Sequence, residues 1–81
     1  MKMHWFEIPC KFEDVALGLY KDTTASINLF ALDTAIDWEI NGWDCTLVTT
    51  KSGNEIIYPN KLSEWIKVLN AEILKFNGSR P

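Results

Sequence analysis

The sequence predicts an α+β protein in which an antiparallel β-meander of four to five strands carries one C-terminal α-helix packed on one face. Apolar residues repeat at helical spacing through the last third of the chain, and short runs rich in β-branched residues, separated by turn sequences, precede it. The chain has 81 residues, of which 47% are hydrophobic. This length suffices for one domain, expected at 1–78, followed by a frayed tail at 79–81.

The helix is expected over residues 61–76. One stripe holds its apolar side chains, namely Leu62, Trp65, Ile66, Leu69, Ile73 and Phe76. Asn60 is a suitable N-cap, because its side chain can accept a hydrogen bond from a free backbone N–H at the helix start. Asn77-Gly78 ends the pattern, since glycine readily adopts the left-handed conformation found after many helices.

Three antiparallel strands are expected before the helix, joined by short turns. Asn41-Gly42 is a strong signal for a two-residue hairpin turn, because both positions of the favoured turn need a positive φ. Residues 51–54 have turn chemistry as well, with Gly53 among them. The strands themselves are expected at 35–40, 44–50 and 55–58.

The first of these strands alternates strictly between apolar and polar residues. Ile36, Trp38 and Ile40 fall on one face, and acidic or amide side chains fall on the other. We expect the apolar face to pack on the helix, where its contacts are Trp65, Ile66, Leu69 and Ile73.

The first third of the chain gives weaker signals. Residues 3–8 are expected to form a strand that Pro9 ends or places at a sheet edge. Residues 12–20 fit one or two helical turns, or a strand broken by Gly18. The segments that follow are expected to be a loop, a short strand and a bend, at 21–24, 26–30 and 33–34.

The charge distribution argues against binding to nucleic acid. The net charge is −3, but residues 1–44 hold eight acids against three lysines, and residues 45–81 hold three acids against five bases. Neither half has the clustered Lys/Arg stripe that contacts a phosphate backbone. No run approaches the roughly 20 apolar residues of a membrane span, and no secretory signal is seen. We therefore expect a cytoplasmic protein without a nucleic-acid or membrane partner, in which Cys10 and Cys45 are reduced thiols.

The chain offers little material for catalysis or metal binding. His4 is its only histidine, and the residues around it support neither a Cys-His pair nor a Ser-His-Asp triad. We expect His4 to be solvated or to lie beside Trp5. A structural zinc site needs four Cys or His ligands, and this chain has two cysteines and one histidine. The sequence therefore predicts a protein that is not an enzyme and has no catalytic residue, metal or cofactor.

Trp43 is the residue that most favours a binding function. It follows Asn41-Gly42 at the hairpin turn, where side chains are usually exposed, and tryptophan is enriched among residues that dominate protein interfaces. Asp37, Glu39 and Asp44 are expected to form a solvated polar ring around it. These four residues are the predicted partner-binding site. The alternative, in which Trp43 packs against a neighbouring strand, stays open.

Three functions are consistent with the sequence. The first is a small non-enzymatic protein-binding module, of the kind that phages and mobile elements encode as an inhibitor or antagonist of a larger protein complex. The second is a structural or self-assembling subunit, with a homodimer as its simplest form. The third is a small-ligand, nucleotide-like sequestering protein with aromatic walls from Trp5, Phe6 and Tyr20. We favour the first because the chain is small and acidic and lacks catalytic groups.

Overall fold

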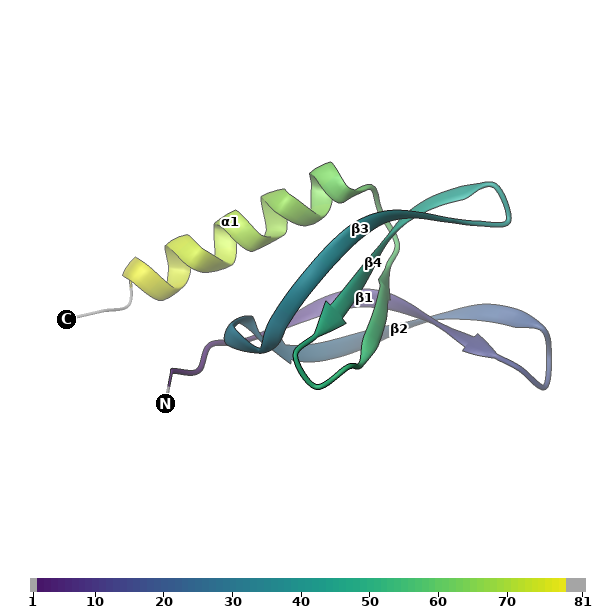
Figure 1. Cartoon of the computed structure of the whole chain (residues 1–81), viewed down its shortest axis with the longest axis horizontal. Coiled ribbons are helices and arrows are strands. Elements are labelled where there is room, and N and C mark those ends of the chain that lie inside the picture. Colours follow the sequence, from purple (N-terminus) through teal and green to yellow (C-terminus); the bar gives the residue numbers. More distant parts are fainter. Residues whose placement is uncertain (1, 79–81) are drawn as a thin grey trace.

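The computed structural model describes residues 2–78 and confirms the α+β class, with five antiparallel strands and one C-terminal helix (Figure 1). The predicted tail at 79–81 lies outside the described residues. In chain order the elements are β1 (Trp5–Asp14), β2 (Leu19–Asn28), the 3-10 turn η1 (Leu29–Ala31), β3 (Leu32–Ile40), β4 (Trp43–Thr50), β5 (Glu55–Tyr58) and α1 (Leu62–Gly78).

The sheet is not a simple meander, because its strand order is β2-β1-β5-β4-β3. β1 and β2 form one hairpin that pairs along its whole length, and β3, β4 and β5 form a three-stranded unit. Within residues 2–78 these two units are joined in the sheet by a single residue pair, Lys11 of β1 with Ile57 of β5. Figure 1 shows the hairpins β1–β2 and β3–β4 diverging toward their turns, with α1 running away from those turns.

The first third of the chain is a long hairpin, which corrects several expectations from the sequence. β1 continues through Pro9, so this proline does not end the strand. β1 pairs with β5 only at Lys11, and one side of Pro9 is therefore an unpaired edge, where proline is tolerated. The predicted loop at 21–24 lies inside β2, and the predicted strand at 26–30 is the end of β2 followed by η1.

Residues 12–20 form a strand, a turn and a second strand, and contain no helical turn. The turn closes because the Asp14 carbonyl accepts hydrogen bonds from Leu17 N at 3.2 Å and from Gly18 N at 2.8 Å. Gly18 has a φ of 66°, a left-handed value that glycine adopts without strain. Local turn chemistry thus overrides the helical spacing of the apolar residues in this segment.

The later turns follow the sequence signals. Asn41 and Gly42 have φ values of 53° and 78°, as the favoured two-residue hairpin turn requires. The turn at 51–54 joins β4 to β5 as predicted. β3 begins before the expected bend at 33–34, which is marked only by a register shift after Leu32.

One apolar core holds the two units and the helix together. Trp65 is 1% exposed, and its ring centroid lies 5.1 Å from that of Tyr58. Around this pair of rings pack Phe6, Ile8 and Ile27 of the hairpin and Val48 of the three-stranded unit. The helix is therefore fixed against both units through one buried indole.

The helix packs on the opposite face of the three-stranded unit from the one expected. Ala35 and Val48 lie on the helix side, whereas Ile36 and Trp38 alternate with them, face away, and are 47% and 48% exposed. On the helix, Trp65 and Leu69 do pack in the core, but against the side of the sheet that carries Val48. The predicted contacts with the face of Ile36 and Trp38 are therefore wrong, and Ile66 and Ile73 are 47% and 43% exposed. Both faces of this unit carry apolar residues, and alternation within one strand does not say which face the helix covers.

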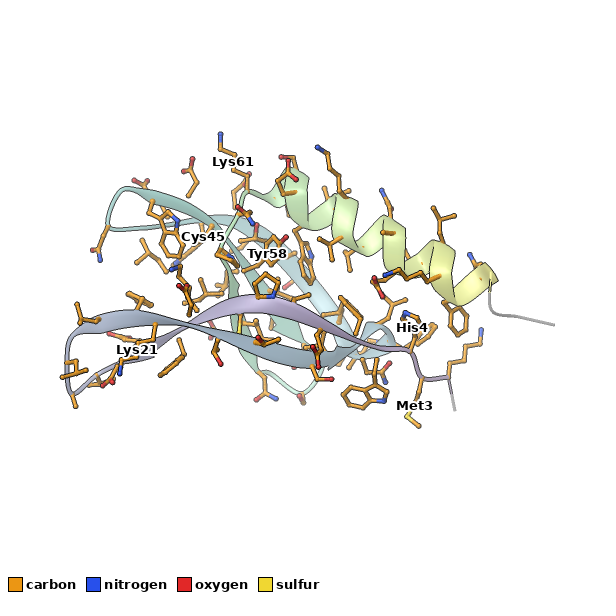
Figure 2. The ribbon with its side chains drawn as sticks, turned by 180° about the vertical axis from the view of Figure 1, so that it is seen from behind. Met3, His4, Lys21, Cys45, Tyr58 and Lys61 are labelled. Atoms are coloured by element: carbon orange, nitrogen blue, oxygen red, sulfur yellow. The ribbon has the colours of Figure 1, made fainter. Side chains whose placement is uncertain are left out.

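The N-terminal segment is tied to the helix by a hydrogen-bonded cluster centred on the buried Glu72. His4 Nε2 donates to Glu72 Oε1 at 3.1 Å, and Lys75 Nζ donates to Glu72 Oε2 at 2.9 Å. The ring of Phe76 meets that of His4 edge-on, with 5.9 Å between centroids. The expectation of a solvated His4 is therefore wrong, as its place beside α1 in Figure 2 makes clear.

Hydrogen bonds from Lys75 and His4 hold the pKa of the Glu72 carboxyl below its usual range, although burial acts in the opposite direction. The ionised carboxylate therefore stabilises the fold at pH values above the pKa that Glu72 has in the unfolded chain. This contribution is lost as the pH falls through the lower pKa of the folded state.

Glu72→Gln is expected to lower the free energy of unfolding at neutral pH by about 1–3 kcal/mol, because it removes the charge from a buried, hydrogen-bonded group. The difference from wild type should shrink on acidification, since Glu72 itself then becomes neutral. Urea unfolding across this pH range measures both effects. Glu64→Gln is the matched control, because Glu64 pairs with Lys67 at the exposed surface. An equal loss in the two variants would contradict the assignment.

Candidate functional site

Trp43, the centre of the predicted binding site, is half-buried on the face of the three-stranded unit that points away from the helix. It pairs with Ile40 across the β3–β4 turn. The Nζ atom of Lys11 lies 4.8 Å from the centre of its ring, and the same atom is 2.6 Å from Asp22 Oδ1. A lysine from the other hairpin thus covers the indole, which the sequence places at an exposed turn.

The three predicted acids lie on the other face and do not surround Trp43. Asp37 pairs with Thr46, and Glu39 pairs with Asp44, so their side chains follow the helix-side face toward the turn. Lys61 Nζ is 3.9 Å from Asp44 Oδ2, a long contact between two exposed side chains that contributes little. The structure therefore divides the predicted site between two faces of the sheet.

The two faces meet at the outer edge of β3. A shallow hollow of about 400 Å³ lies there, lined by Asp37, Trp38, Glu39 and Asp44. Three of these residues are in the predicted site, and Trp38 takes the place of Trp43. Sequence reasoning missed Trp38 because its alternation with the acids placed it on the face assigned to the helix. Trp38 could have been identified from the position of β3 at the edge of the sheet. That position depends on strand order, which the residues around Trp38 do not determine.

β3 is an outer strand, so one side of its backbone has no strand partner among the described residues. Such an edge presents free N–H and C=O groups that can pair with another chain. Residues 32–50 contain four acids and no lysine or arginine, which makes the β3–β4 hairpin negative. The candidate site, called the β3 edge below, combines this free backbone with exposed Ile36 and Trp38 on one face and with Asp37 and Glu39 on the other.

The two cysteines do not form a reactive site. Both are buried and free, which agrees with the expected reduced thiols. Burial raises the pKa of Cys10, and burial together with the neighbouring Asp44 carboxylate raises that of Cys45. Their thiols therefore stay protonated at neutral pH and are poor nucleophiles.

Clusters of metal-binding side chains and membrane-spanning helices are both absent from residues 2–78. No group of three or more His, Cys, Asp and Glu side chains in that range is arranged to hold a metal ion. No helix in the same range is long and apolar enough to cross a membrane. Three of the predicted site residues, Asp37, Glu39 and Asp44, line the hollow at the β3 edge.

The different surroundings of Trp38 and Trp43 predict different effects on stability. Trp38→Ala should lower the free energy of unfolding by less than about 1 kcal/mol, because the side chain is 48% exposed on an outer strand and has little packing to lose. Trp43→Ala should lower it by about 1–3 kcal/mol, because the variant loses both packing and the Lys11 contact. Chemical denaturation of the two variants measures this, and a larger loss for Trp38→Ala would contradict the assignment.

Comparisons with protein families, with characterised proteins and with solved structures found no match to this chain.

Proposed function

We propose that this chain is a small non-enzymatic protein-binding module that accepts an extended, basic segment of a partner protein as an additional strand along β3. The observation that carries the proposal is the β3 edge itself, an outer strand whose far side has no strand partner among residues 2–78, with Trp38 48% exposed and acids on its other face. Addition of a strand to a free sheet edge is a common mode of peptide recognition. In that mode backbone hydrogen bonds supply affinity and alternate side chains supply specificity.

The alternation of β3 sets the chemistry of the partner. A strand laid beside β3 places successive side chains on opposite faces, next to the β3 residues of the same face. On one face the partner meets Ile36 and Trp38, which favour an apolar or aromatic side chain. On the other face it meets Asp37 and Glu39, which favour lysine or arginine. The partner segment should therefore alternate apolar and basic residues.

The same charges disfavour pairing of β3 with a second copy of this chain. Two β3 strands that meet across a two-fold axis bring Asp37 and Glu39 of both copies close together, and like charges across a strand pair are destabilising. The opposite outer strand, β2, is a poorer binding edge. Its middle carries the small hydroxyl side chains of Thr23, Thr24 and Ser26 in place of the aromatic and acidic side chains of β3. The β3 edge thus suits a partner of different sequence.

The proposed mode of binding is compatible with an inhibitory role. While this chain of 81 residues is bound to a basic strand of its partner, no other protein can pair with the same strand. This is consistent with an inhibitor or antagonist of a larger complex, which stays a prediction from the sequence, as do the phage or mobile-element origin and the cytoplasmic location.

Affinity capture from the native host tests the proposal with immobilised wild type, Trp38→Ala and Asp37→Lys/Glu39→Lys. Wild type should retain a partner whose bound segment, mapped by limited proteolysis and mass spectrometry, alternates apolar and basic residues. Each variant should retain about tenfold less of it, because tryptophan anchors and complementary charges dominate such interfaces.

Two matched controls separate the site from general effects of the substitutions. Trp5→Ala removes a tryptophan on β1 that is 59% exposed, against 48% for Trp38, and Glu7→Lys/Glu13→Lys makes the same change in net charge at exposed positions on that strand. Both controls should retain the partner. Equal retention by all five proteins, or loss in the controls alone, would contradict a site at the β3 edge.

A further inference from the structure

A second hollow, of about 360 Å³, lies between the end of β2 and the β4–β5 turn. Ile27 and Ile56 give it an apolar lining continuous with the core, and Trp5 forms a wall with 59% of its surface exposed. Among the three aromatic residues suggested for a ligand site, Trp5 alone lines this hollow, whereas Phe6 lies in the core. An exposed indole beside an apolar recess is a suitable surface for a flat molecule to stack on.

The polar group nearest to Trp5 along the strand pairing is held in a fixed orientation. Asn28 pairs with Trp5 across β1 and β2. Its Oδ1 atom accepts hydrogen bonds from His4 N at 3.1 Å and from Phe30 N at 3.2 Å. Because the carbonyl end of the amide is committed to two backbone donors, the Nδ2 end is left as a donor with no partner among the described residues.

The β4–β5 turn, which also lines the hollow, is held in a fixed orientation by hydrogen bonds of its own. Thr50 Oγ1 and Ser52 Oγ are 2.9 Å apart, and Asn54 Nδ2 donates to Ser52 Oγ at 3.3 Å. Asn54 N also donates to Thr50 Oγ1 at 3.1 Å, which closes the turn on itself. The backbone N and the side-chain Nδ2 of Asn54 both donate within this turn, and its Oδ1 atom is left as an acceptor. Ser26 adds a hydroxyl that can both donate and accept.

We propose that this hollow binds a neutral saccharide. None of the side chains that line it is charged, so it offers no partner to a phosphate, a carboxylate or an ammonium group. It does offer separate donors and acceptors, and the hydroxyl groups around a sugar ring can satisfy both. The C–H-rich face of a pyranose stacks on one aromatic ring, which matches the single indole at this site.

The single aromatic wall also separates a sugar from an unphosphorylated nucleoside. A base has two π-faces and gains most when aromatic or apolar side chains lie on both of them. Among residues 2–78, the rest of the lining holds no second aromatic side chain and includes the hydroxyl- and amide-bearing turn that contains Ser52 and Asn54, which suits a polyhydroxylated molecule better than a base. The assignment stands on this site alone and does not depend on the β3 edge.

Titration of the isotope-labelled chain with neutral mono- and disaccharides tests the inference, with uncharged nucleosides as the competing class. The probes are glucose, mannose, galactose, N-acetylglucosamine and their β1,4- and α1,4-linked dimers. At least one saccharide should shift the backbone amides of residues 25–28 and 50–56 and the indole N–H of Trp5 in a saturable way. Trp5→Ala should weaken that binding by about tenfold or more, and Asn54→Ala should weaken it as well.

Trp38→Ala is the matched control, because it removes an exposed tryptophan from the other candidate site and should leave saccharide binding unchanged. Retained spectral dispersion in each variant shows that it folds, so lost binding is not lost structure. Absence of saturable shifts with every saccharide would overturn the inference, as would shifts that persist in Trp5→Ala. Shifts produced by nucleosides and by no saccharide would assign the hollow to the other class.

Discussion

The structure depends on how its two β-units are joined. Hairpin β1–β2 and the three-stranded unit share only the pair of Lys11 with Ile57, so backbone hydrogen bonds between strands do little to hold them together. The burial of Trp65 at 1% exposure, with side chains from both units around it, supplies most of the connection. Lys11 adds to it, because its ammonium group lies over Trp43 of β4 and pairs with Asp22 of β2. The His4–Glu72 hydrogen bond then ties the chain before β1 to the helix.

This way of joining leaves one side of each outer strand, β2 and β3, without a strand partner in the part of the chain that the structure describes. The first candidate site lies at the edge of β3, and the second lies between the end of β2 and the β4–β5 turn. The hollow beside β3 is lined by three acids and Trp38, whereas the hollow beside β2 is lined by neutral polar groups and Trp5. The proposed occupants are a basic strand at the β3 edge and an uncharged ligand in the second hollow, so each exposed tryptophan serves as the control for the other.

The parts of the fold that local chemistry decides were predictable from the sequence. The positive φ values at Asn41 and Gly42 and the helix around Trp65 follow from residue type and spacing. The parts that failed depend on strand order. Because β1 lies beside β5, the hairpin and the helix both cover the face of Val48, and Trp38 is left exposed. His4 meets Glu72 across 68 positions of sequence, a contact that no local pattern indicates. Three residues of the candidate site were identified as polar and exposed, but the tryptophan beside them was not.

In the proposed complex, a partner strand pairs with the free backbone edge of β3. Amide hydrogen exchange, measured on the chain alone and with its captured partner, tests this most directly, because backbone pairing slows exchange where a strand is added. If a strand is added to β3, the β3 amides that point away from β4 should exchange fast in the free chain and become protected in the complex. The amides of β2 should not change. Protection confined to β2 or to α1, with β3 unchanged, would contradict it.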